Sequence, residues 1–420
     1  MMKSFDVLIV GAGTGGIMTA AQLRKKAPEL TIGIIDPADT HWYQPAWTLV
    51  GAGAYSYQKT ARAMSSVIPA GTEWLKDKVT SLDPDNNQLS TENSGVISYN
   101  ELILSPGLVY NLDGIDGLRE AMDTDYVCSN YLDPGKTYRI LQNFKGGNAV
   151  FTQPTTPIKC GGAPMKIMFL AEDYLRKHGL RDKSNVIFAT PGSVIFGVKE
   201  FAKTLNKIIL KRNIIFKTFY APYKIDSKNK TITFKYVEPE GNDCVINQGV
   251  DIGEQLQGQT DITMPYDILH LAPPQQAPDF IRNSSVAIQE GPGTGWMDVN
   301  KDTLAHNRYD NIHGIGDAAF LPTAKTGAAI RKQAPVVVDR IIAKTKGRTS
   351  NATYSGYSSC PIVTRYGRML LAEFKYGNVR DSDPLLTKFV NTTKESWLMW
   401  LLKLYGLPYL YWNQMMKGKM

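Results

Sequence analysis

Cysteine is scarce in this chain. Four occur among 420 residues, and no two of them form a C-x-x-C pair. So few cysteines exclude a disulfide-stapled scaffold, and the missing pair excludes a zinc ribbon and a thioredoxin-type centre. The five histidines show no metal-ligand spacing either, so we expect no metal site. Each cysteine is therefore either a buried structural thiol or an individually reactive one.

Low-complexity segments, internal repeats and concentrated basic runs are also missing. The net charge of +8 still favours anionic partners, such as a phosphate-bearing cofactor, an anionic substrate or an acidic membrane surface. Without a nucleic-acid signature we expect no nucleic acid partner. An apolar run starts at residue 5, which leaves no room for a signal or transit peptide. We therefore expect a chain that is cytoplasmic in origin or already processed.

The first recognisable motif is a glycine turn. The segment "FDVLIVGAGTGGIMTAAQLRKK" predicts strand, turn and helix, with Gly11, Gly13 and Gly16 in a G-x-G-x-x-G pattern. These glycines allow a tight turn, close approach of a pyrophosphate and close helix packing. A second apolar run ends at Asp36, 20 residues after Gly16 (36 − 16), where an acid binds a ribose. The order predicts a dinucleotide site; a turn without a ligand is the alternative.

Two later segments indicate which dinucleotide. "NIHGIGDAAF" places Asp317 after a short strand, and "YNELILSPG" resembles the strand that usually ends in Ala-Thr-Gly in FAD proteins. In flavoproteins with two dinucleotide domains, the aspartate of the late Gly-Asp pair reaches the ribityl chain of FAD. Asp317 matches that position, and the alternative is an ordinary helix cap. This resemblance favours FAD over NAD.

The middle of the chain lacks a second glycine triplet. NAD(P)H-using relatives carry one there, but "NVIFATPGSVIFG" has only Gly192 and Gly197. A pyrophosphate would lack its close-approach glycines, so we expect no nicotinamide site and a different electron donor.

Two cysteines lie in suggestive contexts. Cys160, in "TPIKCGGAPMK", precedes a segment of helical pattern and is flanked by Lys159 and Lys166. A helix N-terminus and nearby lysines favour the thiolate. Cys360 lies 200 residues later (360 − 160), beyond the late FAD segment. Both flank segments that we expect to converge on the flavin.

These segments carry a more specific resemblance. "HWYQPAWTLVGAGAY", "TPIKCGGAPMKIMFLAEDY", "GIGDAAFLPTAKTGAA" and "GYSSCPIVTRYGRMLLAEF" resemble sulfide:quinone oxidoreductase, in particular its mitochondrial-type branch with two cysteines beside FAD. The similarity runs over essentially the whole chain. It implies FAD-dependent oxidation of hydrogen sulfide to a cysteine-bound persulfide, with the electrons passed to membrane quinone.

The resemblance also implies roles for the cysteines. Cys160 and Cys360 form a disulfide, or a bridge with one extra sulfur, and hydrosulfide attacks Cys360, which becomes the persulfide. Cys160 is released as a thiolate and passes two electrons to FAD. The sulfur then leaves to a small acceptor such as glutathione, sulfite or sulfide. We expect Cys128 and Cys244 to be structural, since neither matches a catalytic context.

Cofactor contacts follow from the same resemblance, position by position. Besides Gly11, Gly13 and Gly16, the implied FAD-binding residues are Thr14, Gly15, Asp36, Gln44, Val79, Asp317, Lys325 and Gly327. Lys325 is expected to stabilise the negative charge of reduced flavin, and a solvated helix lysine is its alternative.

The C-terminal segment "WLMWLLKLYGLPYLYW" carries one charge, Lys403, in 16 residues. A spanning helix needs about 20 apolar residues, and Gly406 and Pro408 interrupt this one. Tryptophan and tyrosine favour the lipid–water interface, and Lys417 and Lys419 suit anionic headgroups. We expect monotopic, peripheral association with a bacterial inner membrane or a mitochondrial inner membrane. A buried helix or a homodimer contact is the alternative.

The expected fold is α/β, with two Rossmann-like three-layer domains and an amphipathic C-terminal region. The expected parts are an FAD domain in two pieces, 1–115 and 291–350, a second Rossmann-like domain, 116–290, and a C-terminal region, 351–420. A type II NADH:quinone oxidoreductase shares this fold and is the competing enzyme. A non-catalytic flavoprotein is the competing module.

Overall fold

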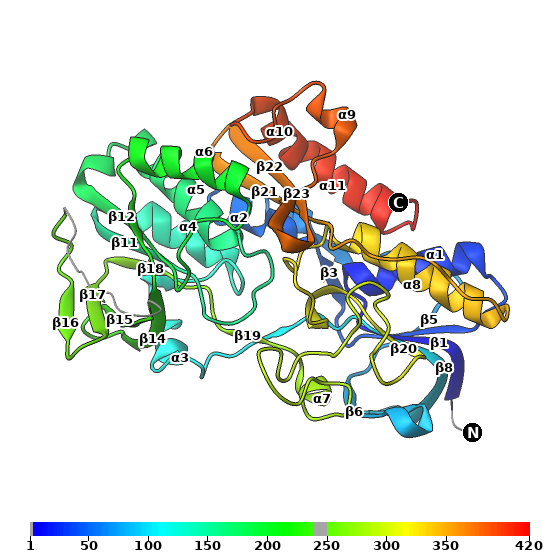
Figure 1. Ribbon diagram of the computed structural model, residues 1–420. Coiled ribbons are helices and arrows are strands. Elements are labelled where there is room, and N and C mark those ends of the chain that lie inside the picture. Colours follow the sequence, from blue (N-terminus) through cyan, green and yellow to red (C-terminus); the bar gives the residue numbers. More distant parts are fainter. Residues whose placement is uncertain (1–2, 238–249) are drawn as a thin grey trace.

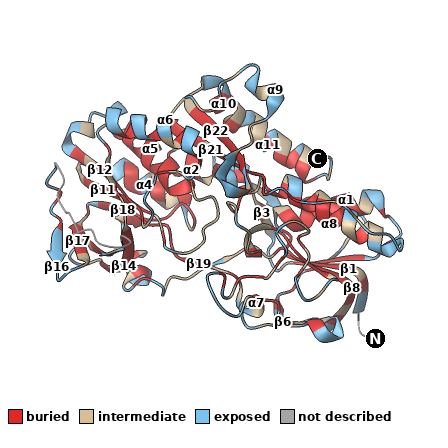
Figure 2. Cartoon of the chain, in the orientation of Figure 1, coloured by how far each residue is buried: buried red, intermediate tan, exposed pale blue. Residues whose placement is uncertain are grey.

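The computed structural model describes residues 3–237 and 250–420, and Cys244 lies outside them. Two α/β bodies lie side by side, and the C-terminal elements pack across the top of both (Figure 1). Buried positions concentrate in the two sheets and in the helix faces that cover them (Figure 2). The expected mixed α/β class is therefore confirmed.

The first body is built on a seven-stranded sheet in the order β5-β2-β1-β8-β7-β6, with β20 against β8. Strands β5, β2, β1, β8 and β20 run parallel, whereas β7 and β6 form an antiparallel extension. The strands are β1 (Lys3–Val10), β2 (Ile32–Ile35), β5 (Glu73–Leu75), β6 (Val79–Asp83), β7 (Gln88–Thr91), β8 (Val96–Leu104) and β20 (Ile312–Gly314).

Strand β1 is apolar on both faces because both faces are covered. Its Val7 and Ile9 pack toward helices α1 (Thr14–Lys26) and α8 (Ile330–Thr345). The alternate residues Leu8 and Val10 pack into a second cluster that includes part of the short helix α7 (Asp279–Arg282). The period of two along a strand thus divides one apolar run between two cores.

The second body has a five-stranded, all-parallel sheet in the order β10-β18-β11-β12-β13. Helices α4, α5 and α6 pack with one of its apolar clusters, and an antiparallel sheet, β14-β15-β17-β16, packs with another. Its elements are β10 (Val127–Cys128), α4 (Pro134–Asn143), β11 (Gly147–Thr152), α5 (Ala163–Lys177), β12 (Ser184–Ala189), α6 (Lys199–Lys211), β13 (Ile215–Lys217), β14 (Tyr220–Asp226), β15 (Thr231–Tyr236), β16 (Gln255–Gln257), β17 (Asp261–Pro265) and β18 (Ile268–His270).

The two strand-to-helix turns of these bodies differ sharply. Strand β1 ends at Val10 and α1 begins at Thr14, so three residues make the first turn. Strand β12 ends at Ala189 and α6 begins only at Lys199, which leaves nine irregular residues, 190–198. The second connection therefore has neither the glycine triplet nor the tight geometry of the first.

The C-terminal region starts with a small antiparallel sheet, β21-β22-β23. A continuous helical segment then runs from Trp397 to Met415, with two π-helical turns inside it. Among the described residues, no helix combines the length and apolar character that crossing a membrane requires. The elements are β21 (Ser358–Arg365), β22 (Arg368–Lys375), β23 (Val379–Arg380), α9 (Pro384–Thr387), α10 (Trp397–Leu401) and α11 (Leu407–Leu410).

The domain limits stay a proposal. Strand β19 (Gln275–Gln276) pairs with β9 (Val109–Tyr110), and Ala277 and Ile281 already pack in the core of the first body. This packing argues for placing the return of the chain to the first domain near residue 277 rather than at 291.

Candidate active site

Three distant segments meet where the two bodies and the C-terminal sheet adjoin. Lys159 and Lys325 form an isolated parallel bridge, and the amide of Cys160 donates to the carbonyl of Lys325 at 2.6 Å. Ser358, at the start of β21, holds the same loop through Thr326 Oγ1 at 2.9 Å. These contacts bring β21, and with it Cys360, to the segment that carries Cys160. The structure thus brings the two cysteines together, and their convergence on the flavin stays a prediction.

Cys160 itself has a strained backbone. Its φ of +50° lies in the left-handed region, which is uncommon for a residue other than glycine. Hydrogen bonds on both sides stabilise this geometry: Tyr131 Oη donates to the carbonyls of Lys159 and Cys160, and the Ala163 amide donates to the Cys160 carbonyl at 2.7 Å. The turn therefore fixes the direction of the Cys160 side chain at the start of α5.

The two thiols are free and adjacent. Cys360 is a hydrogen-bond partner of Cys160, and Lys166 Nζ donates to Cys160 Sγ at 3.0 Å. The hydrogen bond from Cys360 and the charge of Lys166 lower the pKa of Cys160 well below its usual range, although burial opposes them. The same hydrogen bond, together with burial, raises the pKa of Cys360. Cys160 is therefore the thiolate of the pair.

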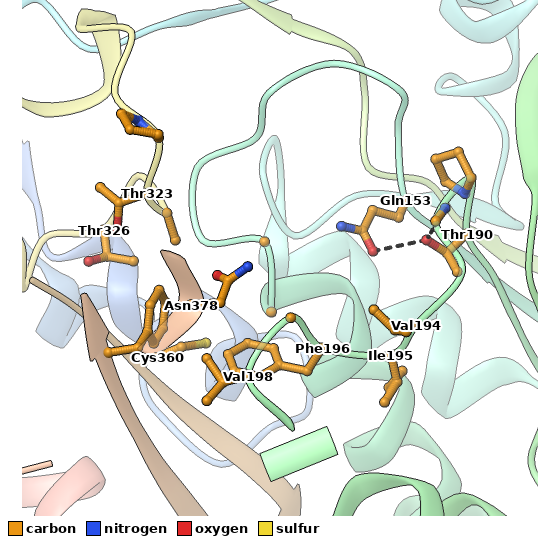
Figure 3. Close-up of a pocket in the computed structure, with 18 residues that line it drawn as sticks. Gln153, Thr190, Val194, Ile195, Phe196, Val198, Thr323, Thr326, Cys360 and Asn378 are labelled. Atoms are coloured by element: carbon orange, nitrogen blue, oxygen red, sulfur yellow. Dashed lines mark hydrogen bonds between the residues drawn. The ribbon is translucent and has the colours of Figure 1, made fainter. Parts of the chain in front are cut away.

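A cavity of about 510 Å³ opens beside Cys360 (Figure 3). Cys360, Thr326 and Thr323 line one side, and Thr190, Val194 and Ile195 line the other. Gly162 also lines it, and a Cβ there would lie 2.5 Å from Cys360 Sγ. The missing side chain therefore leaves the space that Cys360 Sγ occupies at the cavity wall.

The glycine turn has the features of a diphosphate site. Gly11 has a φ of +96°, and a Cβ there would lie 2.4 Å from the Ser105 carbonyl oxygen. At Gly13, the N-cap of α1, a Cβ would meet nothing within 4 Å. Within residues 3–237 and 250–420, no side chain caps this helix, and no acid lies in its first turn, so its amides and positive end are free to bind an anion.

Further predicted cofactor residues lie around this turn. Asp36 accepts from the amides of Ala12 and Ala38, at 2.7 and 2.8 Å, so it is fixed at the end of β2. Burial raises the pKa of its carboxyl group. Thr14 and Gly15 start α1, and Val79 is buried in the cluster that holds the end of β1. Gln44 is exposed, and its Oε1 accepts from Lys159 Nζ at 2.6 Å.

Asp317 and Lys325 lie on the redox side of the first body. Asp317 makes no hydrogen bond within the described residues, and its charged neighbours include Lys159 and Lys325. An unpaired carboxylate is a suitable acceptor for cofactor hydroxyl groups, so these residues fit FAD. Lys325 is buried, not a solvated helix lysine: its Nζ donates to the Ala319 carbonyl and burial lowers its pKa to about 8. Gly327 follows in the loop against Pro45.

One expectation about the thiol environment is wrong. Lys166 contacts Cys160, but Lys159 does not. The ammonium group of Lys159 donates a hydrogen bond to Gln44 and lies 5.1 Å from the centre of the Tyr110 ring. The left-handed turn at Cys160 redirects the chain, so two lysines that both lie near Cys160 in sequence point to different sites. Cys128 is buried in β10, and burial raises its pKa to about 12, as suits a structural thiol.

Sequence reasoning missed three residues of the site. Tyr411 Oη contacts Thr14 Oγ1 at 2.8 Å and His41 Nε2 at 2.6 Å, which ties the C-terminal segment to the glycine turn. Lys403 is buried, with Nζ donating to the Pro45 carbonyl at 2.7 Å. Gly162 abuts Cys360. Only Lys403 gave a signal, as the one charge in an apolar segment.

Comparisons with known proteins agree with this geometry. A family model for pyridine nucleotide-disulphide oxidoreductases matches residues 5–140. The mitochondrial sulfide:quinone oxidoreductases of Mus musculus and Dictyostelium discoideum are 40% and 39% identical to this chain, over 99% and 98% of it and 87% and 86% of their own lengths. The X-ray structure of the sulfide:quinone oxidoreductase from Aquifex aeolicus shares the fold, with a TM-score of 0.80, 20% identity, and coverage of 99% and 92%.

Proposed function

The chain belongs to the mitochondrial-type sulfide:quinone oxidoreductases, a family of FAD-dependent flavoproteins, and on that premise we propose that it oxidises hydrogen sulfide at the Cys160–Cys360 pair. The electrons pass through FAD to a quinone. One observation carries this proposal: two thiols 200 residues apart in the sequence (360 − 160) are neighbours, and the buried Lys166 donates to Cys160 Sγ at 3.0 Å, which favours the thiolate.

The chemistry starts from the oxidised pair. Hydrosulfide attacks Cys360 Sγ of the disulfide, a new S–S bond forms there, and the electron pair of the broken bond leaves on Cys160. Lys166 stabilises this leaving thiolate, because a low thiol pKa makes a better leaving group. An acceptor then takes the terminal sulfur from Cys360, which restores two thiols. Bound FAD supplies the two-electron acceptor for their reoxidation to the disulfide.

Residues of the first body are proposed to hold FAD. Gly11, Gly13, Gly15, Gly16 and Thr14 would bind the diphosphate at the α1 N-terminus. Asp36 would bind the ribose and Val79 the adenine side. Asp317, Lys325, Gly327 and Gln44 would bind the ribityl and flavin end. The free N-terminus of α1 and the unpaired Asp317 support this assignment.

The cavity beside Cys360 is proposed to admit hydrosulfide and a small sulfur acceptor. Its volume of about 510 Å³ is in the range of small-molecule sites. Glutathione, sulfite and a second sulfide remain the candidate acceptors. Part of the cavity wall comes from the segment 190–198 of the second body, where relatives that use NAD(P)H would carry their glycine turn.

We propose peripheral docking on a quinone-containing membrane through the C-terminal region. Trp397, Leu398, Tyr405 and Tyr409 are large apolar side chains of one helical segment, and all are more than half exposed. Aromatic side chains of this kind favour the interface between lipid and water. Relatives from mouse and Dictyostelium are named mitochondrial, which favours the mitochondrial inner membrane over a bacterial one. A homodimer remains a proposal without a supporting contact.

Anaerobic titration of the purified flavoprotein tests this function. Sulfide is expected to bleach the oxidised flavin absorbance, and a soluble quinone to restore it, whereas NADH leaves it unchanged. Bleaching by NADH but not by sulfide would overturn the proposal in favour of an NADH:quinone oxidoreductase. Bleaching by neither would favour a non-catalytic flavoprotein.

A further inference from the structure

A buried lysine arrives at the redox centre from the C-terminal segment. Lys403 is only 2% exposed, in the π-helical turn Leu402–Gly406. Its ammonium donates to the Pro45 carbonyl, and no carboxylate pairs with it among the described residues. A buried ammonium without an anion is costly. Its position therefore needs a reason beyond packing.

The groups around Lys403 supply that reason. The titratable neighbours that act on it are Lys166 of α5, Cys160 of the preceding loop and Cys360 of β21. Residues flanking Lys403 on both sides, Leu402 and Leu404, pack against the apolar cluster that contains Cys360, and Cys160 packs against the same cluster. Burial and Lys166 lower the pKa of Lys403 to about 7, whereas the two thiols favour its charged form. Among the described residues, the groups that favour the charged forms of both Lys166 and Lys403 are the two thiols, so sulfur anions can offset these buried ammonium groups.

We propose that Lys403 is a positioning residue that acts, together with Lys166, as the second counter-cation of the Cys160–Cys360 pair. Two cations match the charge that the proposed function creates. When hydrosulfide opens the disulfide, Cys160 becomes a thiolate, and the persulfide on Cys360 becomes a second anion once its proton leaves to solvent. Lys166 contacts Cys160 directly, and Lys403 supplies the additional positive field.

The inference rests on the proposed function in one respect, because sulfide oxidation is what generates the thiolate and persulfide anions. Its test uses no sulfide. The reduced FAD-loaded protein is treated anaerobically with iodoacetamide across a pH series, and alkylation of Cys160 is read by peptide mass spectrometry. An opposite charge within about 4–6 Å lowers an acid's pKa by roughly 1–3 units. Lys403→Met is therefore expected to raise the apparent pKa of Cys160 by about one unit. At a pH below that pKa, the variant should hold about tenfold less Cys160 thiolate than the wild type.

Three variants make the result specific. Lys403→Arg restores the charge and is expected to keep the wild-type profile. Lys388→Met removes the same charge from an exposed position beyond α9, and is expected to change nothing. Lys166→Met removes the direct partner and is expected to raise the pKa of Cys160 further. If Lys403→Met fails to hold FAD, Lys403→Gln removes the charge and retains an N–H donor.

The inference would be overturned if Cys160 alkylation depends on pH in Lys403→Met as it does in the wild type, while Lys166→Met shifts that dependence. An equal shift in Lys388→Met would also overturn it, because the effect would then reflect net charge. The alkylation of Cys160 can be measured even if the protein does not oxidise sulfide. Failure of the proposed function and failure of this inference are therefore distinguishable.

Discussion

At the scale of single residues, surroundings decide which cysteine can react. Cys128 and Cys160 are the same side chain with opposite acidities. Burial raises the pKa of Cys128 to about 12 and outweighs the charge of Lys136, whereas a hydrogen bond from Cys360 and the charge of Lys166 lower the pKa of Cys160. The reactive thiol is thus defined by its neighbours and by the left-handed turn that orients it.

The space beside Cys360 leads to a prediction at Gly162. Its backbone is in the right-handed helical region, so alanine is tolerated there, but the added Cβ would lie 2.5 Å from Cys360 Sγ. A displacement of the reacting sulfur by about 1 Å can cost roughly 10²-fold in rate. We expect Gly162→Ala to lower sulfide-dependent turnover by about that factor, measured as the initial rate of quinone reduction.

The neighbouring glycine provides the control. At Gly161 an added Cβ would meet only Ile158 at 3.8 Å, an ordinary contact. Gly161→Ala should therefore keep most of the activity. Equal losses in the two variants would mean that the loop as a whole, and not the space beside the sulfur, limits the reaction.

The sequence predicted the residues that belong to local motifs. Gly11, Gly13 and Asp36 follow from spacing alone, and Cys160 and Cys360 from their contexts. It failed where a side chain's partner lies far away in sequence. Lys159 and Lys166 were indistinguishable until the turn at Cys160 was seen. Lys403 stood out as the one charge in an apolar segment, but nothing local marks its contact with Pro45.

At the scale of elements, the C-terminal helical segment supports the cofactor turn. Its Tyr411 contacts Thr14 and His41, and the carbonyl of Met420 accepts from Gln22 of α1. Burial lowers the pKa of His41 to about 4, so this ring is neutral at physiological pH. Its Nε2 can therefore accept a hydrogen bond from Tyr411 Oη. The segment therefore helps to fix the first residue of α1.

Removing one hydroxyl group tests this support. A hydrogen bond contributes about 0.5–1.5 kcal/mol net, which corresponds to roughly three- to tenfold in affinity. We expect Tyr411→Phe to raise the FAD dissociation constant by that factor, measured by flavin fluorescence on dilution. Tyr409→Phe, on an exposed side chain of α11, is the matched control. If the wild type, Tyr411→Phe and Tyr409→Phe bind FAD equally, Tyr411 does not support the cofactor turn.

A second element-scale prediction concerns the connection between β5 and β6. Burial raises the pKa of Asp77, but hydrogen bonds from Ser94, Lys78 and Asn93 outweigh it, so the folded pKa lies below the unfolded one. Such a group stabilises the fold above its unfolded pKa of about 3.9 and loses this contribution as pH falls toward the folded value.

Asp77→Asn should therefore lower the free energy of unfolding by about 1.5–3 kcal/mol at neutral pH, measured by urea denaturation. The difference from wild type should narrow below about pH 4. Asp123→Asn, at an exposed position, should leave the urea midpoint unchanged. A difference between Asp77→Asn and wild type that is constant with pH would show that the charge is not responsible.

At the scale of the whole molecule, the C-terminal helical segment at the top of the view in Figure 1 carries four large exposed side chains, Trp397, Leu398, Tyr405 and Tyr409. Full burial of such a side chain is worth about 1.5–3 kcal/mol, or roughly tenfold or more in binding. We expect Leu398→Ser and Tyr405→Ser each to weaken flotation with phospholipid vesicles by about tenfold. Leu210→Ser, on the far body, should float like the wild type.

The most direct test of the central claim is the anaerobic reaction of sulfide with the flavin in Cys160→Ser. If Cys160 passes the electrons of sulfide to FAD, rapid mixing should bleach the flavin of the wild type and of Cys128→Ser, and leave that of Cys160→Ser oxidised. Bleaching of Cys160→Ser at the wild-type rate would contradict the account.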